Sequence, residues 1–76
     1  MVRIKGWEYQ GKACPACDEW WLNKKAKVAL VIKVIPQING RYLYEIRVGR
    51  RKIASVRAYR IARKKAIEWM RKHPNG

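Results

Sequence analysis

Two closely spaced cysteines are the residues of this chain best suited to bind a metal. Cys14 and Cys17 form a C-P-x-C knuckle, and thiolates at this spacing can converge on one tetrahedral zinc ion. A structural zinc site needs four ligands, so the others would have to come from elsewhere. The candidates are Asp18, Glu19 and His73, or a second cysteine pair from the partner in a homodimer.

The same cysteine spacing also fits states without a metal. A disulfide or a pair of free structural thiols is the favoured interpretation, and zinc is the first alternative. A redox motif ranks last, because the βαβ context of such motifs is missing. Thr and Phe are absent while Lys, Arg and β-branched residues are plentiful, a composition typical of a thermophile, where intracellular disulfides do occur.

Positive charge is the second chemical signal. Nineteen Lys and Arg face five Asp and Glu, which gives 76 residues a formal net charge of +14. Such self-repulsion favours a polyanionic partner, and nucleic acid is the first candidate. We expect no membrane span, because VALVIKVI is short and interrupted by Lys33, and no secretory signal. The expected setting is the cytoplasm.

Residues for catalysis are sparse. The chain has one His, one Ser and no Thr, its five carboxylates are scattered, and no Gly-rich phosphate loop occurs. We therefore expect a binding protein, not an enzyme, with zinc as the sole cofactor left open.

A β-hairpin is predicted around Gly49-Arg50. Residues 41–48 alternate between an apolar and a mostly polar face, the period of a strand. Gly at the first central position suits a type II′ turn of two residues. The pairs expected on one face are Val48–Arg51, Ile46–Ile53 and Tyr44–Ser55, and those on the other are Arg47–Lys52 and Glu45–Ala54.

A further strand is predicted over Lys27 to Ile35, where both faces are fairly apolar. Pro36 and Asn39-Gly40 indicate a loop, which we expect to be long or bulged, so that Val34 pairs with Tyr44 and Ile32 with Ile46. Val2 to Tyr9 is predicted as a short strand. Residues 10–23 are predicted as a turn with one helical turn, in which Trp20 and Trp21 cover one end of the core.

A basic amphipathic helix is predicted from Ala58 to Lys72. Tyr59, Ala62, Ala66 and Met70 recur at three- and four-residue spacing and form an apolar stripe that can cover a sheet. The predicted fold is α+β: a three- or four-stranded antiparallel sheet with one C-terminal helix packed on one face. It forms a single domain over 1–76, with an N-terminal strand and cysteine knuckle (1–25), antiparallel strands (26–57) and the helix (58–72).

Part of the hairpin resembles a known family. The segment GRYLYEIR is similar to the second strand of plant AP2-type DNA-binding domains, and a basic turn, a third strand and a helix with spaced alanines follow in the same order. Arm-site-binding domains of phage-type integrases share that plan. The residues that carry the resemblance are Gly40, Tyr42, Glu45, Ile46, Arg47, Ala62 and Ala66.

The resemblance implies that the exposed sheet face enters the major groove of DNA, with Arg41 and Arg47 on the second strand and the Arg50–Lys52 turn in contact. Together with the basic residues expected on that face, the candidate nucleic-acid-binding residues are Lys27, Lys33, Arg41, Leu43, Arg47, Arg50, Arg51 and Lys52. Double-stranded DNA is the predicted ligand. The alternatives are RNA or single-stranded nucleic acid, and an interaction module that docks an acidic protein.

Overall fold

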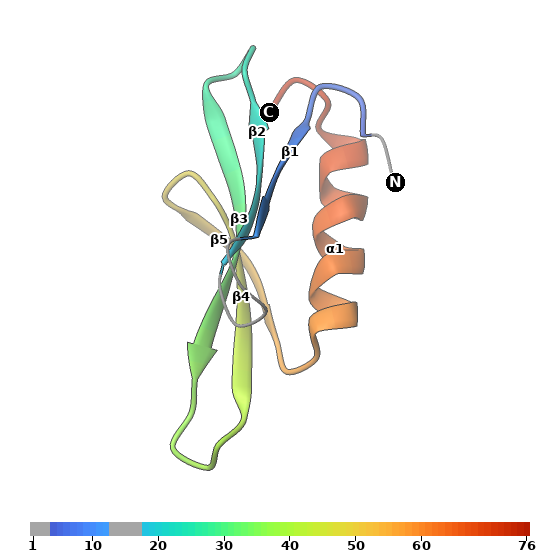
Figure 1. The fold of residues 1–76 in the computed structure, drawn as a ribbon. Helices are drawn as coiled ribbons and strands as arrows, with labels where there is room; N and C mark the ends of the chain where they lie inside the picture. The colour runs from blue at the N-terminus through green and yellow to red at the C-terminus, as the bar shows by residue number, and fades with distance from the viewer. Residues whose placement is uncertain (1–3, 13–17) are drawn as a thin grey trace.

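The computed structural model describes residues 4–12 and 18–76. The knuckle at Cys14 and Cys17 lies outside the described residues, so its disulfide, zinc and redox alternatives stay predictions. Five strands precede one helix (Figure 1). They are β1 (Glu8–Lys12), β2 (Glu19–Asn23), β3 (Val28–Pro36), β4 (Tyr42–Val48), β5 (Arg51–Val56) and α1 (Tyr59–Lys72).

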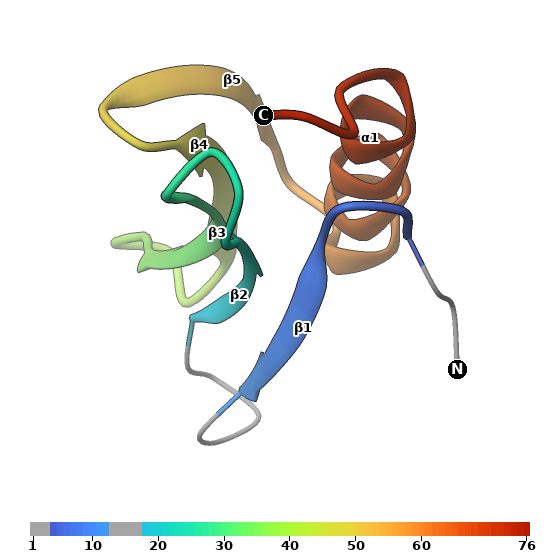
Figure 2. The same cartoon turned by 90° about the horizontal axis from the view of Figure 1, so that it is seen from above.

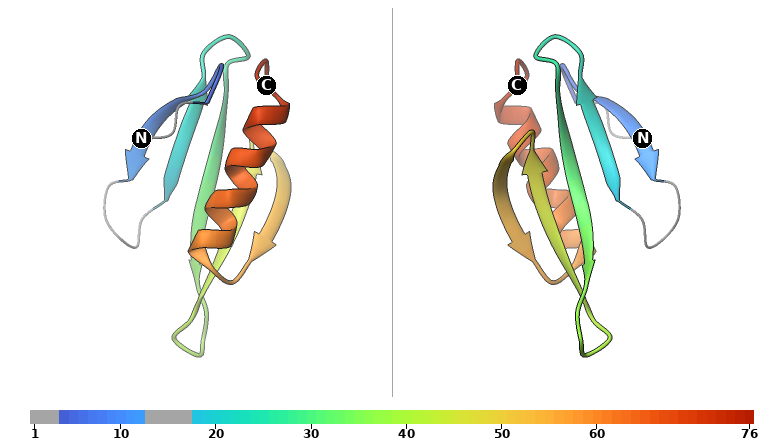
Figure 3. Two further views of the ribbon diagram at one scale, coloured as in Figure 1. Left: turned by 90° about the vertical axis from the view of Figure 1, so that its right-hand side faces the viewer. Right: turned by 90° about the vertical axis from the view of Figure 1, so that its left-hand side faces the viewer.

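The strands form one antiparallel sheet in the order β1-β2-β3-β4-β5, and α1 lies across one face of it (Figures 1 and 3). The right-hand view of Figure 3 shows the other face, which no helix covers. The predicted α+β class is confirmed, and the sheet has five strands where three or four were predicted. In the part of the chain that the structure describes, no helix is long and apolar enough to cross a membrane.

The prediction of a turn with one helical turn over 10–23 is wrong for the end of β1 and for β2, whereas residues 13–17 lie outside the described residues. The alternation of β2 is inverted, because the polar Glu19 and Asn23 are buried at 3% and 0% exposure while Trp20 is 40% exposed. Trp21 does cover the core, but Trp20 points to the other face. Buried polar residues are tolerated where hydrogen bonds satisfy them, and such bonds come from distant parts of the chain.

The pairing of β3 with β4 is as predicted. Val34 pairs with Tyr44 and Ile32 with Ile46. The connection is a loop over 37–41, closed by a 2.8 Å hydrogen bond from the Gln37 amide to the Arg41 carbonyl. This hairpin projects beyond the other strands at one end of the molecule (Figure 1).

The pairing of β4 with β5 starts as predicted and then shifts by one residue. Val48 pairs with Arg51 and Arg47 with Lys52, but Ile46 then faces Ala54 instead of Ile53. The remaining predicted pairs are wrong for the same reason, since Tyr44 faces Val56 and Glu45 faces Ser55. A bulge at Ile53 accounts for the shift: it lets Ile53, Ala54 and Val56 all pack against the core, where strict alternation would have turned Ser55 inward.

The helix matches its predicted range, and its small residues set the packing distance. Ala62, Ala66 and Met70 are fully buried against Leu30, Ile32 and Ile46 of the central strands. Burying one such aliphatic side chain contributes about 1.5–3 kcal/mol. Leu30, Ile32, Ile46 and Met70 therefore contribute much of the stability of this small domain.

The first and last described segments are joined beside the C-terminal end of α1 (Figure 2). The predicted strand over Val2 to Tyr9 is realised differently: Ile4 and Trp7 form an isolated bridge, and β1 begins only at Glu8. The Trp7 indole donates to the His73 carbonyl at 2.9 Å and packs edge-on against Trp69. These contacts fix the N-terminal segment to the end of the helix.

Candidate nucleic-acid interface

The face of the sheet opposite α1, here called the open face, carries a row of side chains that crosses four strands. The register aligns Trp20 of β2 with Val31 of β3, Val31 with Arg47 of β4, and Arg47 with Lys52 of β5. Because alternate residues of a strand point to opposite faces, this row lies away from the helix. An aromatic ring, an aliphatic side chain and two cations thus stand in line.

Two further rows continue the open face toward the β3–β4 loop. Lys33 aligns with Glu45 and Glu45 with Ser55, and beyond them Ile35 aligns with Leu43. The aliphatic residues are half-buried while Lys33 is exposed. The result is a mixed apolar and basic surface.

One ion pair lies within this surface. The Nη1 atom of Arg47 is 2.8 Å from Oε1 of Glu45, and the two side chains are 41% and 13% exposed. The pair orients the Arg47 guanidinium, and the Glu45 carboxylate offsets the positive charge of this part of the surface. Lys33 and Lys52 are exposed and have no ion-pair partner among the described residues, so they carry the free positive charge of the face.

The structure brings together half of the predicted site. Lys33, Leu43, Arg47 and Lys52 share the open face, and Trp20, which sequence reasoning assigned to the core, joins them. A period-2 reading of β2 would have found Trp20, but the polar residues on its buried side hid that strand. The other predicted residues, Lys27, Arg41, Arg50 and Arg51, lie elsewhere.

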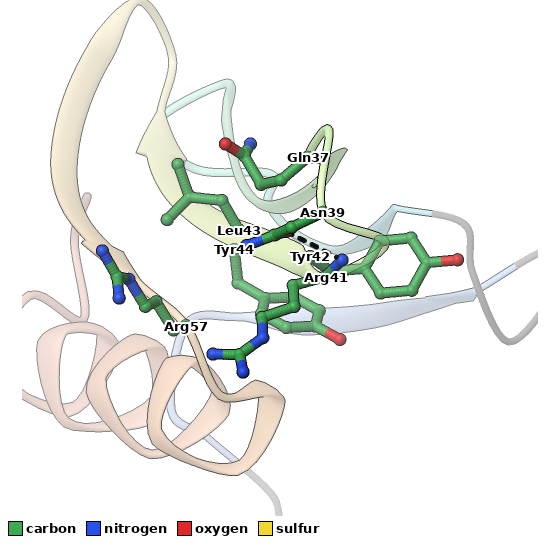
Figure 4. Close-up of a pocket in the computed structure, with 7 residues that line it drawn as sticks. All are labelled: Gln37, Asn39, Arg41, Tyr42, Leu43, Tyr44 and Arg57. Atoms are coloured by element: carbon green, nitrogen blue, oxygen red, sulfur yellow. Dashed lines mark hydrogen bonds between the residues drawn. The ribbon is translucent and has the colours of Figure 1, made fainter.

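Two of those four were predicted on the open face, and the structure corrects both. Lys27 precedes β3 in a turn and has a left-handed backbone with φ of 55°. Arg41 precedes β4 and lines a pocket together with Arg57 (Figure 4). Arg50 lies in the β4–β5 turn as predicted, and Arg51 pairs with Val48, which packs against the core.

The exposed side of the helix is the other basic surface. Arg63 contributes only part of its charge to this surface, because its Nε atom is 3.8 Å from the buried Glu19 carboxylate. The apolar residues of this surface include Ile61, which is 50% exposed, and the half-buried Ile67 and Trp69, which pack against the core. Its exposed charged residues are Arg60, Lys64, Lys65, Glu68, Arg71 and Lys72.

Glu19, a candidate metal ligand in the sequence, joins three elements of the structure. Its carboxylate accepts hydrogen bonds from the hydroxyls of Tyr9, at 2.6 Å, and Tyr59, at 2.5 Å. Burial and the hydrogen bond to Glu19 raise the pKa of Tyr59 to about 12. The hydrogen bond to Glu19, with partial burial, also raises the pKa of Tyr9.

The two other proposed metal ligands are also engaged. Asp18 accepts a hydrogen bond from the Val34 amide at 3.0 Å, and the His73 ring stacks on Trp69 with ring centroids 4.0 Å apart. Within 4–12 and 18–76, no three His, Cys, Asp or Glu side chains gather in a way that could hold a metal ion. The described residues thus offer no complete ligand set.

Comparison with known proteins yielded no match to a protein-family model, a curated protein or a solved structure. The resemblance to AP2-type and integrase arm-site domains therefore stays a prediction. The open face must be interpreted from its own chemistry.

Proposed function

We propose that this protein binds double-stranded DNA through the open face and is not an enzyme. The observation that carries the proposal is the row Trp20–Val31–Arg47–Lys52, a mixed apolar and basic line on an uncovered sheet face in a protein of charge +14. A basic surface attracts DNA and gains affinity by releasing counterions from its phosphates. We place this binding in the cytoplasm.

The dimensions of a sheet suit this mode of binding. Neighbouring strands lie about 4.8 Å apart, and the major groove, about 12 Å wide, admits a two-stranded β-ribbon, so two neighbouring strands of the open face can enter it. In the proposed complex, Lys33 and Lys52 contact phosphates, while Arg47 reaches base edges from the position that Glu45 fixes. Phosphate contacts position the protein, and base contacts supply whatever sequence preference it has.

An exposed tryptophan supports a second candidate. Aromatic side chains on open sheet faces stack on unpaired bases, so the 40% exposure of Trp20 also fits RNA or single-stranded DNA. The row crosses the sheet with only this one exposed ring, whereas cations and aliphatic residues make up the rest. That composition favours the duplex.

A binding titration tests the proposal and separates the candidates. Fluorescence anisotropy would compare duplex DNA, single-stranded DNA and RNA of one sequence, each at low and at physiological salt. We expect the duplex to bind most tightly and its affinity to fall steeply with salt. Tighter binding of a single strand would favour the second candidate. Absence of binding to all three would instead point to an acidic protein as the partner.

A further inference from the structure

A pocket of about 530 Å³ lies at the end of β4, beside the β3–β4 loop (Figure 4). Its volume falls within the roughly 300–1,000 Å³ typical of ligand sites. The pocket exists because β5 is shorter than β4: the β4–β5 pairing ends at Tyr44 and Val56. Within the described residues, Tyr42 and Leu43 pair with β3 but have no partner strand on their other side. The edge of β4 is therefore open there.

Two arginines from separate parts of the chain line this pocket. Arg41 comes from the β3–β4 loop and Arg57 follows β5 immediately before α1, and both are exposed. Figure 4 shows Arg41 extending from the loop toward Arg57. Neither guanidinium forms an ion pair in the part of the chain that the structure describes. Two unneutralised guanidiniums that line one pocket are suited to bind a phosphate group, because each can contact phosphate oxygens with two parallel hydrogen bonds.

The remaining lining residues are suited to a nucleobase. Tyr42, which is 44% exposed, and the half-buried Tyr44 add aromatic rings, and Figure 4 shows Tyr42 at the end of the pocket away from Arg57. The amide of Asn39 is anchored by a 3.1 Å hydrogen bond from the Arg41 amide to its Oδ1, so its NH2 group can still donate. Unpaired bases are bound by stacking on such rings and by polar side chains at their edges.

The pocket also adjoins the open face. Leu43 lines the pocket and is at the same time the last β4 residue of the open face, aligned with Ile35. A nucleic acid lying across the open face would thus bring one strand to the pocket. A base within the duplex is stacked between its neighbours and its edge is paired, whereas an overhanging nucleotide at a strand end can offer both its face and its edge to the pocket.

We propose that this pocket binds one unpaired nucleotide at the end of a nucleic-acid strand, with its phosphate on Arg41 and Arg57 and its base on Tyr42 and Tyr44. This proposal rests on the proposed nucleic-acid binding and assigns it a preferred substrate: a duplex end that carries an overhang. The ligand chemistry is that of a nucleoside monophosphate.

The test measures the ratio of two dissociation constants by fluorescence anisotropy. One probe is a short blunt duplex, and the other is the same duplex with a short 5′-phosphorylated overhang. We expect the natural protein to bind the overhang probe about tenfold more tightly, because stacking of one base alone can supply such a factor. Arg57→Ala and Tyr42→Ala should each bring the ratio close to one. Because a lost charge weakens binding of both probes, its general effect cancels in the ratio of the two dissociation constants.

Two control variants separate the pocket from general effects. Tyr42→Phe retains the ring and should keep the preference, and Arg71→Ala removes a charge from the far end of the helix and should also keep it. Free deoxyadenosine monophosphate at millimolar concentration should compete with the overhang probe and not with the blunt one. Thermal melting would show that each variant is folded.

The outcomes distinguish this proposal from the one on which it rests. Equal affinity for both probes, or a preference that survives Arg57→Ala and Tyr42→Ala, would overturn the pocket alone. Binding of the overhang probe without binding of the blunt duplex would support the pocket and refute duplex binding by the open face. Failure to bind either probe would refute both.

Discussion

The carboxylate of Glu19 accepts hydrogen bonds from tyrosines on two separate elements, Tyr9 of β1 and Tyr59 of α1. The Nε atom of Arg63 lies 3.8 Å from Oε1 of Glu19, the same oxygen that accepts the hydrogen bond from Tyr59. Among the described residues, every buried side-chain polar atom has a hydrogen-bond partner. A buried carboxylate is tolerated when it is satisfied in this way. Glu19 therefore links β1 and α1 to β2.

Tyr59 makes the stability of the fold decline as the pH rises through the alkaline range. An unperturbed tyrosine has a pKa of about 10, whereas burial and Glu19 raise the pKa of Tyr59 to about 12 in the folded protein. The folded state thus holds the proton more tightly, so the stabilisation is complete below pH 10 and is lost as the pH rises from about 10 to about 12. Urea unfolding at several pH values should show this decline, and Tyr59→Phe should flatten it. An equally steep decline in the variant would assign the effect to other groups.

Gly6 is required by a close approach between the two ends of the fold. Its backbone has φ of +84°, and a Cβ atom would lie 1.9 Å from the carbonyl oxygen of Pro74. We expect Gly6→Ala to lower the free energy of unfolding by about 3 kcal/mol, from backbone strain plus steric overlap. Gly40→Ala is the matched control, because φ is +78° but nothing lies within 4 Å of the added atom. It should cost about 1–2 kcal/mol, from strain alone. Equal losses in denaturant unfolding would mean that the overlap at Pro74 is relieved at no cost.

The start of α1 is the least stabilised part of that element. Ala58 has the extended conformation of an N-cap residue, with φ of −120° and ψ of 131°, but its side chain cannot accept a hydrogen bond, and the first turn contains no acidic residue. Ala58→Ser should therefore stabilise the protein by about 1 kcal/mol and raise its Tm by about 4–8 °C. Ala58→Val adds bulk without an acceptor and should not stabilise. A serine variant no more stable than the valine variant in thermal melts would argue against this cap.

Elements with simple apolar periodicity were predictable, and those stabilised by distant polar contacts were not. The helix and the β3–β4 register follow from alternation and spacing that are visible within each segment. Strand β2 was missed because its buried positions hold Glu19 and Asn23. Asn23 is satisfied by a 3.1 Å hydrogen bond to the Pro74 carbonyl, a residue far away in the sequence. The bulge at Ile53 was missed because strict alternation was assumed for this segment, although the adjacent apolar residues Ile53 and Ala54, followed by the polar Ser55, interrupt it.

For the molecule as a whole, net charge pointed to a polyanion but could not locate the surface. Lysines and arginines occupy both the open face and the exposed side of α1, so charge alone does not distinguish these two surfaces. The row across four strands required the register of β2, and the pocket at Arg41 and Arg57 required the relative lengths of β4 and β5. These properties depend on tertiary structure. Composition therefore predicted the class of ligand, whereas the fold was needed to propose where it binds.

Two pairs of exposed lysines provide the most direct test of DNA binding by the open face. The double variant Lys33→Ala with Lys52→Ala removes two charges from the open face, and Lys65→Ala with Lys72→Ala removes two from the helix. Both double variants reduce the net charge equally, so any difference between them reports the position of the lysines.

The measurement is the slope of the logarithm of duplex affinity against the logarithm of salt concentration. Each phosphate contact contributes about 0.9 to that slope. We predict that the open-face pair lowers the slope by about 2 and weakens binding, while the helix pair leaves it near the value of the natural protein. A larger loss from the helix pair, or equal losses from both, would contradict binding through the open face.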